Sequence, residues 1–118
     1  MKTLVIGASH KPERYSNIAM NLLRKYAHET VALGRKERKF NDWHILEGQP
    51  TLENIDTITL YLNPGNQKDY YQYIKNLQPR RVIFNPGTEN EAFENDLEKA
   101  GIETERACTL VLLNTGQY

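Results

Sequence analysis

Residues 4–9, Leu-Val-Ile-Gly-Ala-Ser, are the stretch on which the predicted fold depends. The apolar run at residues 4–6 predicts a buried strand, and Gly7-Ala8-Ser9 follows it as a turn. Ser16-Asn17 then opens an amphipathic segment, which predicts a helix with Ser16 as its N-cap. In α/β domains a strand, a glycine turn and a helix N-terminus form a phosphate cradle, because bare backbone admits a ligand and the helix offers free N–H groups. We therefore expect a nucleotide or cofactor site here.

Apolar runs alternate with helical periodicity along the rest of the chain. Five segments are expected to be strands: residues 3–6, 30–33, 57–62, 81–84 and 102–106. The apolar stripes of the helices between them fall at residues 18–26, 66–77 and 93–100. This alternation, with short connections, predicts one α/β domain over residues 1–118: a Rossmann-like, doubly wound parallel sheet of about five strands with helices on both faces. Ligands bind such sheets at the carboxyl ends of the strands. The four turns expected at that edge begin at Gly7, Gly34, Asn63-Pro64 and Asn85-Pro86-Gly87, and we expect them to converge there.

Local signals predict several smaller features. The polar residues 37–42 are expected to be irregular, and residues 43–46 to form a short extended piece. Thr51 is expected to cap a short helix, and Thr88, with a glutamate three residues later, resembles a capping box for the next helix. Residues 110–113 fit either a sixth strand or one helical turn.

Composition excludes several classes of protein. The chain has 118 residues, with 15 basic and 15 acidic side chains, so its net charge does not favour nucleic acid or an anionic membrane as a partner. No apolar stretch approaches the roughly 20 residues that a membrane helix needs. The single cysteine, Cys108, excludes an internal disulfide framework and a cysteine metal cluster. A reduced, cytoplasmic setting is the expectation.

The residues that follow the first and second predicted strands reduce the number of candidate ligands. The dinucleotide fingerprint is G-x-G-x-x-G, whereas Gly7-Ala8-Ser9 holds one glycine. NAD sites usually place an acidic residue after the second strand, and this chain has Arg35 and Lys36 there. Two cations suit a phosphorylated ribose. The candidates are therefore the 2′-phosphate of NADP and the 3′-phosphate of coenzyme A.

The opening of the chain also resembles a known family. The string at residues 5–9, followed by Lys-Pro-Glu-Arg-Tyr-Ser-Asn at residues 11–17, resembles the stand-alone CoA-binding domain family. That family is similar to the CoA-binding domain of the succinyl-CoA synthetase α subunit. The resemblance extends over nearly the whole chain, through Gly48, Pro64 and Gly87 to Cys108.

The resemblance implies a set of cofactor-binding residues. Those at the first turn and helix start would meet the phosphates and pantetheine, the cations after the second strand the adenosine phosphate, and the later turns the adenine and pantetheine. The implied residues are Gly7, Ala8, Ser9, Arg14, Ser16, Asn17, Arg35, Lys36, Pro64, Asn85 and Gly87.

The expected function is therefore non-covalent binding of coenzyme A or an acyl-CoA by a carrier, sensor or regulatory module. The alternative is an NADP-dependent oxidoreductase-type nucleotide-binding protein, and a third interpretation is an interaction module with an empty cradle. The sequence contains no self-contained catalytic constellation and no metal-ligand spacing, so catalysis by this chain alone is not expected. A symmetric homodimer is expected from the general behaviour of such folds.

Overall fold

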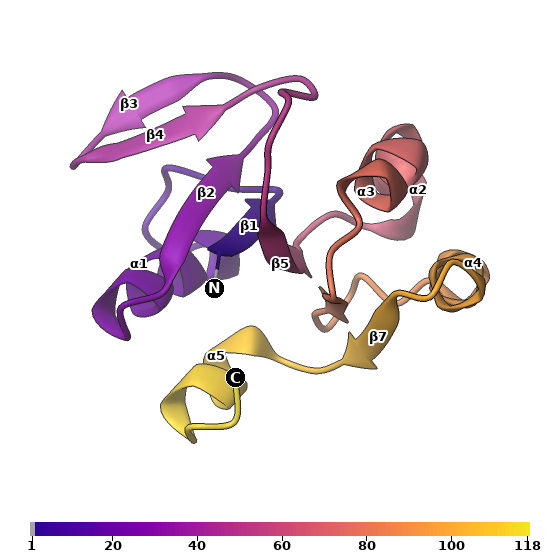
Figure 1. Ribbon diagram of the computed structural model, residues 1–118. Coiled ribbons are helices and arrows are strands. Elements are labelled where there is room, and N and C mark those ends of the chain that lie inside the picture. Colours follow the sequence, from indigo (N-terminus) through magenta and orange to yellow (C-terminus); the bar gives the residue numbers. More distant parts are fainter. Residues whose placement is uncertain (1) are drawn as a thin grey trace.

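A seven-stranded sheet with the strand order β3-β4-β2-β1-β5-β6-β7 forms the centre of the molecule (Figure 1). The computed structural model describes residues 2–118. The strands are β1 (Lys2–Ile6), β2 (Glu29–Leu33), β3 (Arg38–Phe40), β4 (Trp43–Leu46), β5 (Ile55–Leu60), β6 (Arg81–Phe84) and β7 (Glu103–Arg106). The helices are α1 (Tyr15–Lys25), α2 (Pro64–Gln67), the 3₁₀ turn η1 (Lys68–Tyr70), α3 (Tyr71–Leu77), α4 (Glu91–Lys99) and α5 (Thr109–Asn114).

The Rossmann-like α/β class is confirmed, but the sheet has seven strands rather than about five, and it is mixed rather than parallel. Six strands run parallel, and β3 runs antiparallel to β4. β3 lies in the segment that was expected to be irregular. The sequence did not predict this strand because an exposed edge strand needs no apolar pattern. The turn between β3 and β4 holds Asn41 at φ 45° and Asp42 at φ 66°. Two successive positive φ values are typical of a tight hairpin turn, and Asn and Asp tolerate them.

Helices cover both faces of the sheet, as predicted (Figure 1). On β1 the alternating side chains Leu4 and Ile6 pack with α3 and α4, whereas Val5 packs with α1 and α5. Both sets are fully buried. The continuous apolar run of β1 therefore has its expected cause: a central parallel strand is covered on both sides.

Two helix starts differ from the predicted ones. Helix α1 begins at Tyr15 with Arg14 as N-cap, so Ser16 is already a helical residue and not the cap. The N-cap of α4 is Asn90, not Thr88: the Asn90 side chain accepts from the Phe93 N–H at 3.2 Å, and Glu94, one residue beyond the capping-box position, accepts from the Asn90 N–H at 2.8 Å. The same polar pattern fits two registers, and packing of the apolar stripe selects one.

Three other segments depart from the expected structure. The helix predicted at residues 66–77 is divided into α2, η1 and α3, and it begins earlier, at Pro64. Thr51 caps no helix, since residues 51–54 are irregular and Ile55 opens β5. Residues 110–113 lie within α5, which resolves the open choice in favour of the helical turn. Within residues 2–118 no helix has both the length and the apolar character that crossing a bilayer requires.

Candidate functional site

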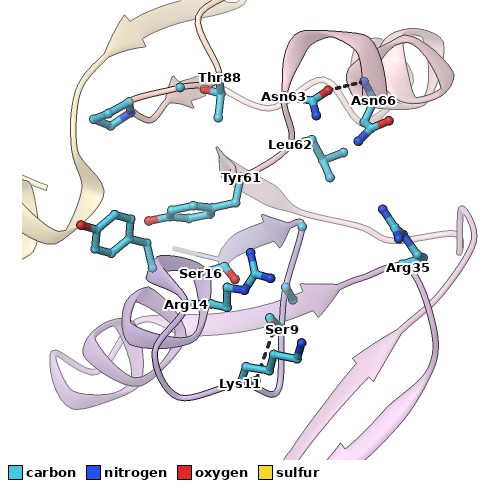
Figure 2. Close-up of a pocket in the computed structure, with 15 residues that line it drawn as sticks. Ser9, Lys11, Arg14, Ser16, Arg35, Tyr61, Leu62, Asn63, Asn66 and Thr88 are labelled. Carbon is cyan, nitrogen blue, oxygen red and sulfur yellow. Dashed lines mark hydrogen bonds between the residues drawn. The ribbon is translucent and has the colours of Figure 1, made fainter.

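A cavity of about 610 Å³ opens at the carboxyl ends of β1, β2, β5 and β6 (Figure 2). β1 and β5 are neighbours in the sheet but are separated in the chain by β2, β3 and β4, so their junction is the point where the strand order reverses. All four turns that the sequence placed at this end contribute to the cavity or to its neighbour. Their predicted convergence is confirmed.

Gly7 is required by the neighbouring strand. Its φ is 93°, and a Cβ at this position would lie 2.8 Å from the backbone oxygen of Tyr61. The N–H groups of Gly7 and Ala8 both donate to the Leu33 oxygen, at 2.9 and 3.0 Å. The absence of a Cβ at Gly7 thus has a structural cause, because the Tyr61 backbone approaches closely, and these two amides are used within the chain; the approach of a ligand to Gly7 stays a prediction.

The N-terminus of α1 offers backbone N–H groups to the cavity, whereas the N–H groups of Gly7 and Ala8 in the first turn are already bonded within the chain. The first bond within the helix runs from the Ile18 N–H to the Arg14 oxygen at 3.1 Å, so the preceding N–H groups have no acceptor inside the helix. In the part of the chain that the structure describes, α1 has neither a side-chain cap nor an acidic residue in its first turn. Tyr15 and Ser16 of this turn line the cavity. The positive end of the helix dipole therefore faces the cavity.

Positive side chains surround the same opening. Lys11, Arg14 and Arg35 line the cavity, and no acidic residue does so among residues 2–118. None of the three cations forms an ion pair with any described residue. Figure 2 shows Arg14 beside Ser16 and Arg35 across the opening. A cavity of this composition favours an anion with several charges.

A second cavity of about 400 Å³ adjoins the first and shares Gly7, Arg35, Leu62 and Asn66 with it. It extends toward residues 47–48 and 69–70, and its wall is of mixed character because two carboxylates and the ring of Tyr70 belong to it. Such a wall suits an uncharged aromatic base better than a phosphate.

The predicted site residues fall into two groups. Seven of them line the first cavity: Gly7, Ala8, Ser9, Arg14, Ser16, Arg35 and Gly87. The other four do not line either cavity: Asn17, Lys36, Pro64 and Asn85. Lys36 and Pro64 are exposed outside the two linings.

Asn17 and Asn85 are buried, and their amides serve the protein itself. The Asn17 side chain donates to the Ser9 oxygen at 2.9 Å and so holds the first turn against α1. The Asn85 Nδ2 donates to Thr59 Oγ1 at 2.7 Å and to the Leu60 oxygen at 2.8 Å, while its Oδ1 accepts from the Thr109 N–H at 2.8 Å. This geometry supports a structural role for both residues, and the implied ligand contacts stay predictions.

Several lining residues were not among the predicted site. These are Lys11, Tyr15, Tyr61, Leu62, Asn63, Asn66, Pro86 and Thr88. Lys11 and Tyr15 lie inside the string that carries the family resemblance, and Pro86 belongs to a turn already placed at this end. Tyr61 and Leu62 had a weaker signal, because they read as the end of the third predicted strand, whereas β5 ends at Leu60.

Comparisons with known proteins agree with this description. The family model for a CoA binding domain matches residues 1–114. A crystal structure described as that of an uncharacterized protein is 45% identical, with a TM-score of 0.96 over 99% of this chain and 97% of the other. A search of curated proteins found no match.

More distant structures share the fold. A protein from Thermus thermophilus is 20% identical with a TM-score of 0.82, over 99% of this chain and 90% of the other. A conserved hypothetical protein from Pyrococcus furiosus is 22% identical with a TM-score of 0.80, over 93% and 97%. At these identities the similarity concerns the fold alone.

Proposed function

Because the chain belongs to the CoA-binding domain family, we propose that it binds coenzyme A or an acyl-CoA non-covalently and acts as a carrier, sensor or regulatory module. The observation that carries this proposal is the cavity at the uncapped start of α1, which has three cations and no acidic residue in its wall among residues 2–118. Coenzyme A carries a diphosphate and a separate 3′-phosphate, so its charge matches that wall.

In this proposal the diphosphate lies at the first turn of α1, where free N–H groups and Arg14 meet it. Arg35 belongs to both cavities and meets the phosphate on the ribose. The adenine occupies the second cavity beside Tyr70. The pantetheine arm then leaves along the turn after β6, past Gly87. No step of chemistry is assigned to the chain.

NADP is the rival ligand, and Arg35 is the observation that favours it. A cation after the second strand suits a 2′-phosphate as well as a 3′-phosphate. The two ligands differ beyond the diphosphate, since NADP continues there as a second nucleoside and coenzyme A as a flexible pantetheine arm.

Isothermal titration calorimetry of the folded chain separates the two ligands. We expect heat with coenzyme A and acetyl-CoA, weaker binding of dephospho-CoA by roughly tenfold or more, and weaker binding of NADP and NAD. The Arg35→Gln variant should bind coenzyme A and dephospho-CoA with equal affinity. Arg38→Gln, an exposed cation on β3 outside both cavities, is the matched control and should keep the difference.

Two results would contradict the proposal. If the folded chain shows no heat with coenzyme A or acetyl-CoA at high concentration, the ligand is wrong. If NADP binds more tightly than coenzyme A, the site belongs to the rival class.

A further inference from the structure

Gln67, the last residue of α2, is fully buried and lines neither cavity. Its Nε2 donates to the Leu62 oxygen at 2.9 Å and to the Thr88 oxygen at 2.7 Å. Leu62 belongs to the turn after β5 and Thr88 to the turn after β6, and both line the first cavity (Figure 2). The Gln67 Oε1 accepts from Asn90, the N-cap of α4, at 3.0 Å. One fully bonded amide group therefore joins two walls of the candidate site.

The backbone does not hold these two turns together. The last backbone pair between β5 and β6 is Leu60 with Phe84. Beyond this pair, no backbone hydrogen bond joins the two turns in the part of the chain that the structure describes. Asn85 bonds back to the Leu60 oxygen at the strand end, whereas the bond between the cavity-lining parts of the turns is made by Gln67. The distance between the turns therefore depends on this side chain.

Each turn is closed by hydrogen bonds of its own. After β5, the Asn66 N–H donates to the side chain of Asn63 at 2.9 Å and to its backbone oxygen at 3.0 Å. After β6, the N–H and the hydroxyl of Thr88 both donate to the Asn85 oxygen, at 2.9 and 2.7 Å. Loss of the Gln67 amide should therefore change the spacing of two intact turns.

We propose that Gln67 is a positioning residue that sets the width of the first cavity for the pantetheine arm of coenzyme A, without touching the ligand. This inference rests on the proposed function, in which the diphosphate lies at α1 and the arm leaves along the turn after β6. A ligand that reaches both turns requires the correct spacing between them, whereas a ligand that ends at the diphosphate does not. A spacing that is already formed also lowers the entropy cost of binding a flexible arm.

The test compares coenzyme A with adenosine 3′-phosphate 5′-diphosphate, which is the same ligand without its pantetheine arm. Gln67→Met keeps nearly the length of the side chain but removes both donors, so the two carbonyl groups lose this partner. Calorimetry should show that coenzyme A binds roughly tenfold more weakly, while the affinity for the nucleotide without the arm is unchanged. Gln72→Met is the matched control, because Gln72 is exposed on α3, bonds only to Asn76 and lies outside both cavities. It should bind both ligands as the unaltered chain does.

Gln67→Glu gives a second measurement, which serves if the methionine variant does not fold. When it is protonated, the introduced carboxyl group has one O–H donor and can bond to one of the two carbonyl groups; when it is ionised, it has none. The affinity of this variant for coenzyme A, relative to that of the unaltered chain, should therefore rise as the pH is lowered from about 8 to about 5.5. The same ratio for the nucleotide without the arm should stay constant. Repulsion between a carboxylate and the phosphates would instead change both ratios.

Three results would overturn the inference while coenzyme A still binds the unaltered chain. The first is an equal loss of affinity for both ligands in Gln67→Met, because Gln67 would then support the fold as a whole. The second is an unchanged affinity for coenzyme A in the folded Gln67→Met variant. The third is a coenzyme A ratio in Gln67→Glu that does not depend on pH. Failure of the unaltered, folded chain to bind coenzyme A would instead overturn the proposed function.

Discussion

The two ends of the central sheet differ in whether their positively charged side chains are paired with carboxylates. At the amino end three cations each meet a carboxylate: Lys2–Glu29 at 3.6 Å, Arg80–Asp56 at 3.0 Å and Arg81–Glu105 at 3.4 Å. At the carboxyl end Lys11, Arg14 and Arg35 line one cavity with no acidic partner among the described residues. Both ends belong to the same strands and the same core, so the fold alone does not require the difference.

The contrast between the two ends indicates that the unpaired groups at the carboxyl end lower the stability of the folded chain. Gathered like charges repel one another, and an orphaned hydroxyl such as that of Tyr61 lowers stability further. At the amino end each of the three cations is paired and Tyr118 bonds to Thr3 at 2.5 Å, although the Nη2 of Arg81 is also buried without a hydrogen-bond partner. Cations that line one cavity without acidic partners are typical of a site that a ligand completes. Substitutions at either end test this contrast, beginning with the one of largest effect.

Gly7→Ala should damage the carboxyl end most. A Cβ there would lie 2.8 Å from the Tyr61 oxygen, and the φ of 93° is unfavourable for alanine. We expect the free energy of unfolding to fall by about 3 kcal/mol, measured by urea denaturation. The control is Gly87→Ala, where φ is 92° but nothing lies within 4 Å, so the loss should be about 1 kcal/mol. Equal losses would show that the contact with Tyr61 is unimportant.

Asn85→Ala tests whether this residue supports the fold rather than the ligand. Three hydrogen bonds would be lost, and of their buried partners Thr59 would keep only its bond to the Thr109 hydroxyl. We expect the free energy of unfolding to fall by about 2–3 kcal/mol. Asn76→Ala removes an exposed asparagine that bonds only to Gln72, and its effect should be close to zero. If Asn85→Ala retained full stability and lost only ligand affinity, the implied ligand contact would be restored.

Arg14→Gln probes the unpaired charges of the carboxyl end. Binding of coenzyme A should weaken by roughly tenfold, because one charge-assisted contact is lost, and calorimetry measures this directly. Stability should stay the same or rise, since one member of an unpaired positive cluster is removed. Arg80→Gln at the amino end should do the reverse, with unchanged affinity and slightly lower stability. Loss of stability in Arg14→Gln would mean that its charge is already balanced within the protein.

Asp56→Asn should have the smallest effect. The hydrogen bond from Arg80 holds the pKa of Asp56 below its usual range. The pair therefore stabilises the fold at pH values above the ordinary pKa of an aspartate, about 4, and this contribution is lost as the pH falls through the lowered pKa. Because Arg80 is half exposed, the variant should lose less than about 1 kcal/mol at pH 7. In acid denaturation curves the difference should disappear once Asp56 is protonated in the folded protein, below its lowered pKa; a difference that persists there would exclude the ion pair as its cause.

Local patterns predicted the regular elements that depend on burial. All five predicted strands exist, with small changes at their ends. The central strands β1, β5 and β6 are buried on both faces, which explains their apolar runs, whereas the edge strand β7 is polar and partly exposed. The turns at the carboxyl end were also found, and seven of the eleven predicted residues line the cavity there. Whether these seven contact a cofactor stays a prediction.

The errors share a different cause. β3 was missed because its pairing uses backbone atoms only, and the pair Asn41-Asp42 was the available signal. Ser16 and Thr88 were taken for caps because several polar residues precede each helix, and only packing selects the register. Asn85 lies outside both cavity linings although it was among the implied cofactor-binding residues, because a polar side chain after a buried strand looks the same whether it faces a cavity or α5; its contact with a cofactor stays a prediction.

Residue types along the chain were enough to establish the α/β class, the strand–turn–helix opening and the position of four turns at one end of the sheet. This was possible because buried strands and glycine turns can be recognised from the residue types of a short segment. Which polar groups are already satisfied became visible in the folded molecule alone. Asn17 and Asn85 are paired within the protein, whereas the start of α1, three cations and the hydroxyl of Tyr61 are left over. That division depends on distances between segments far apart in the chain, and no local pattern records them.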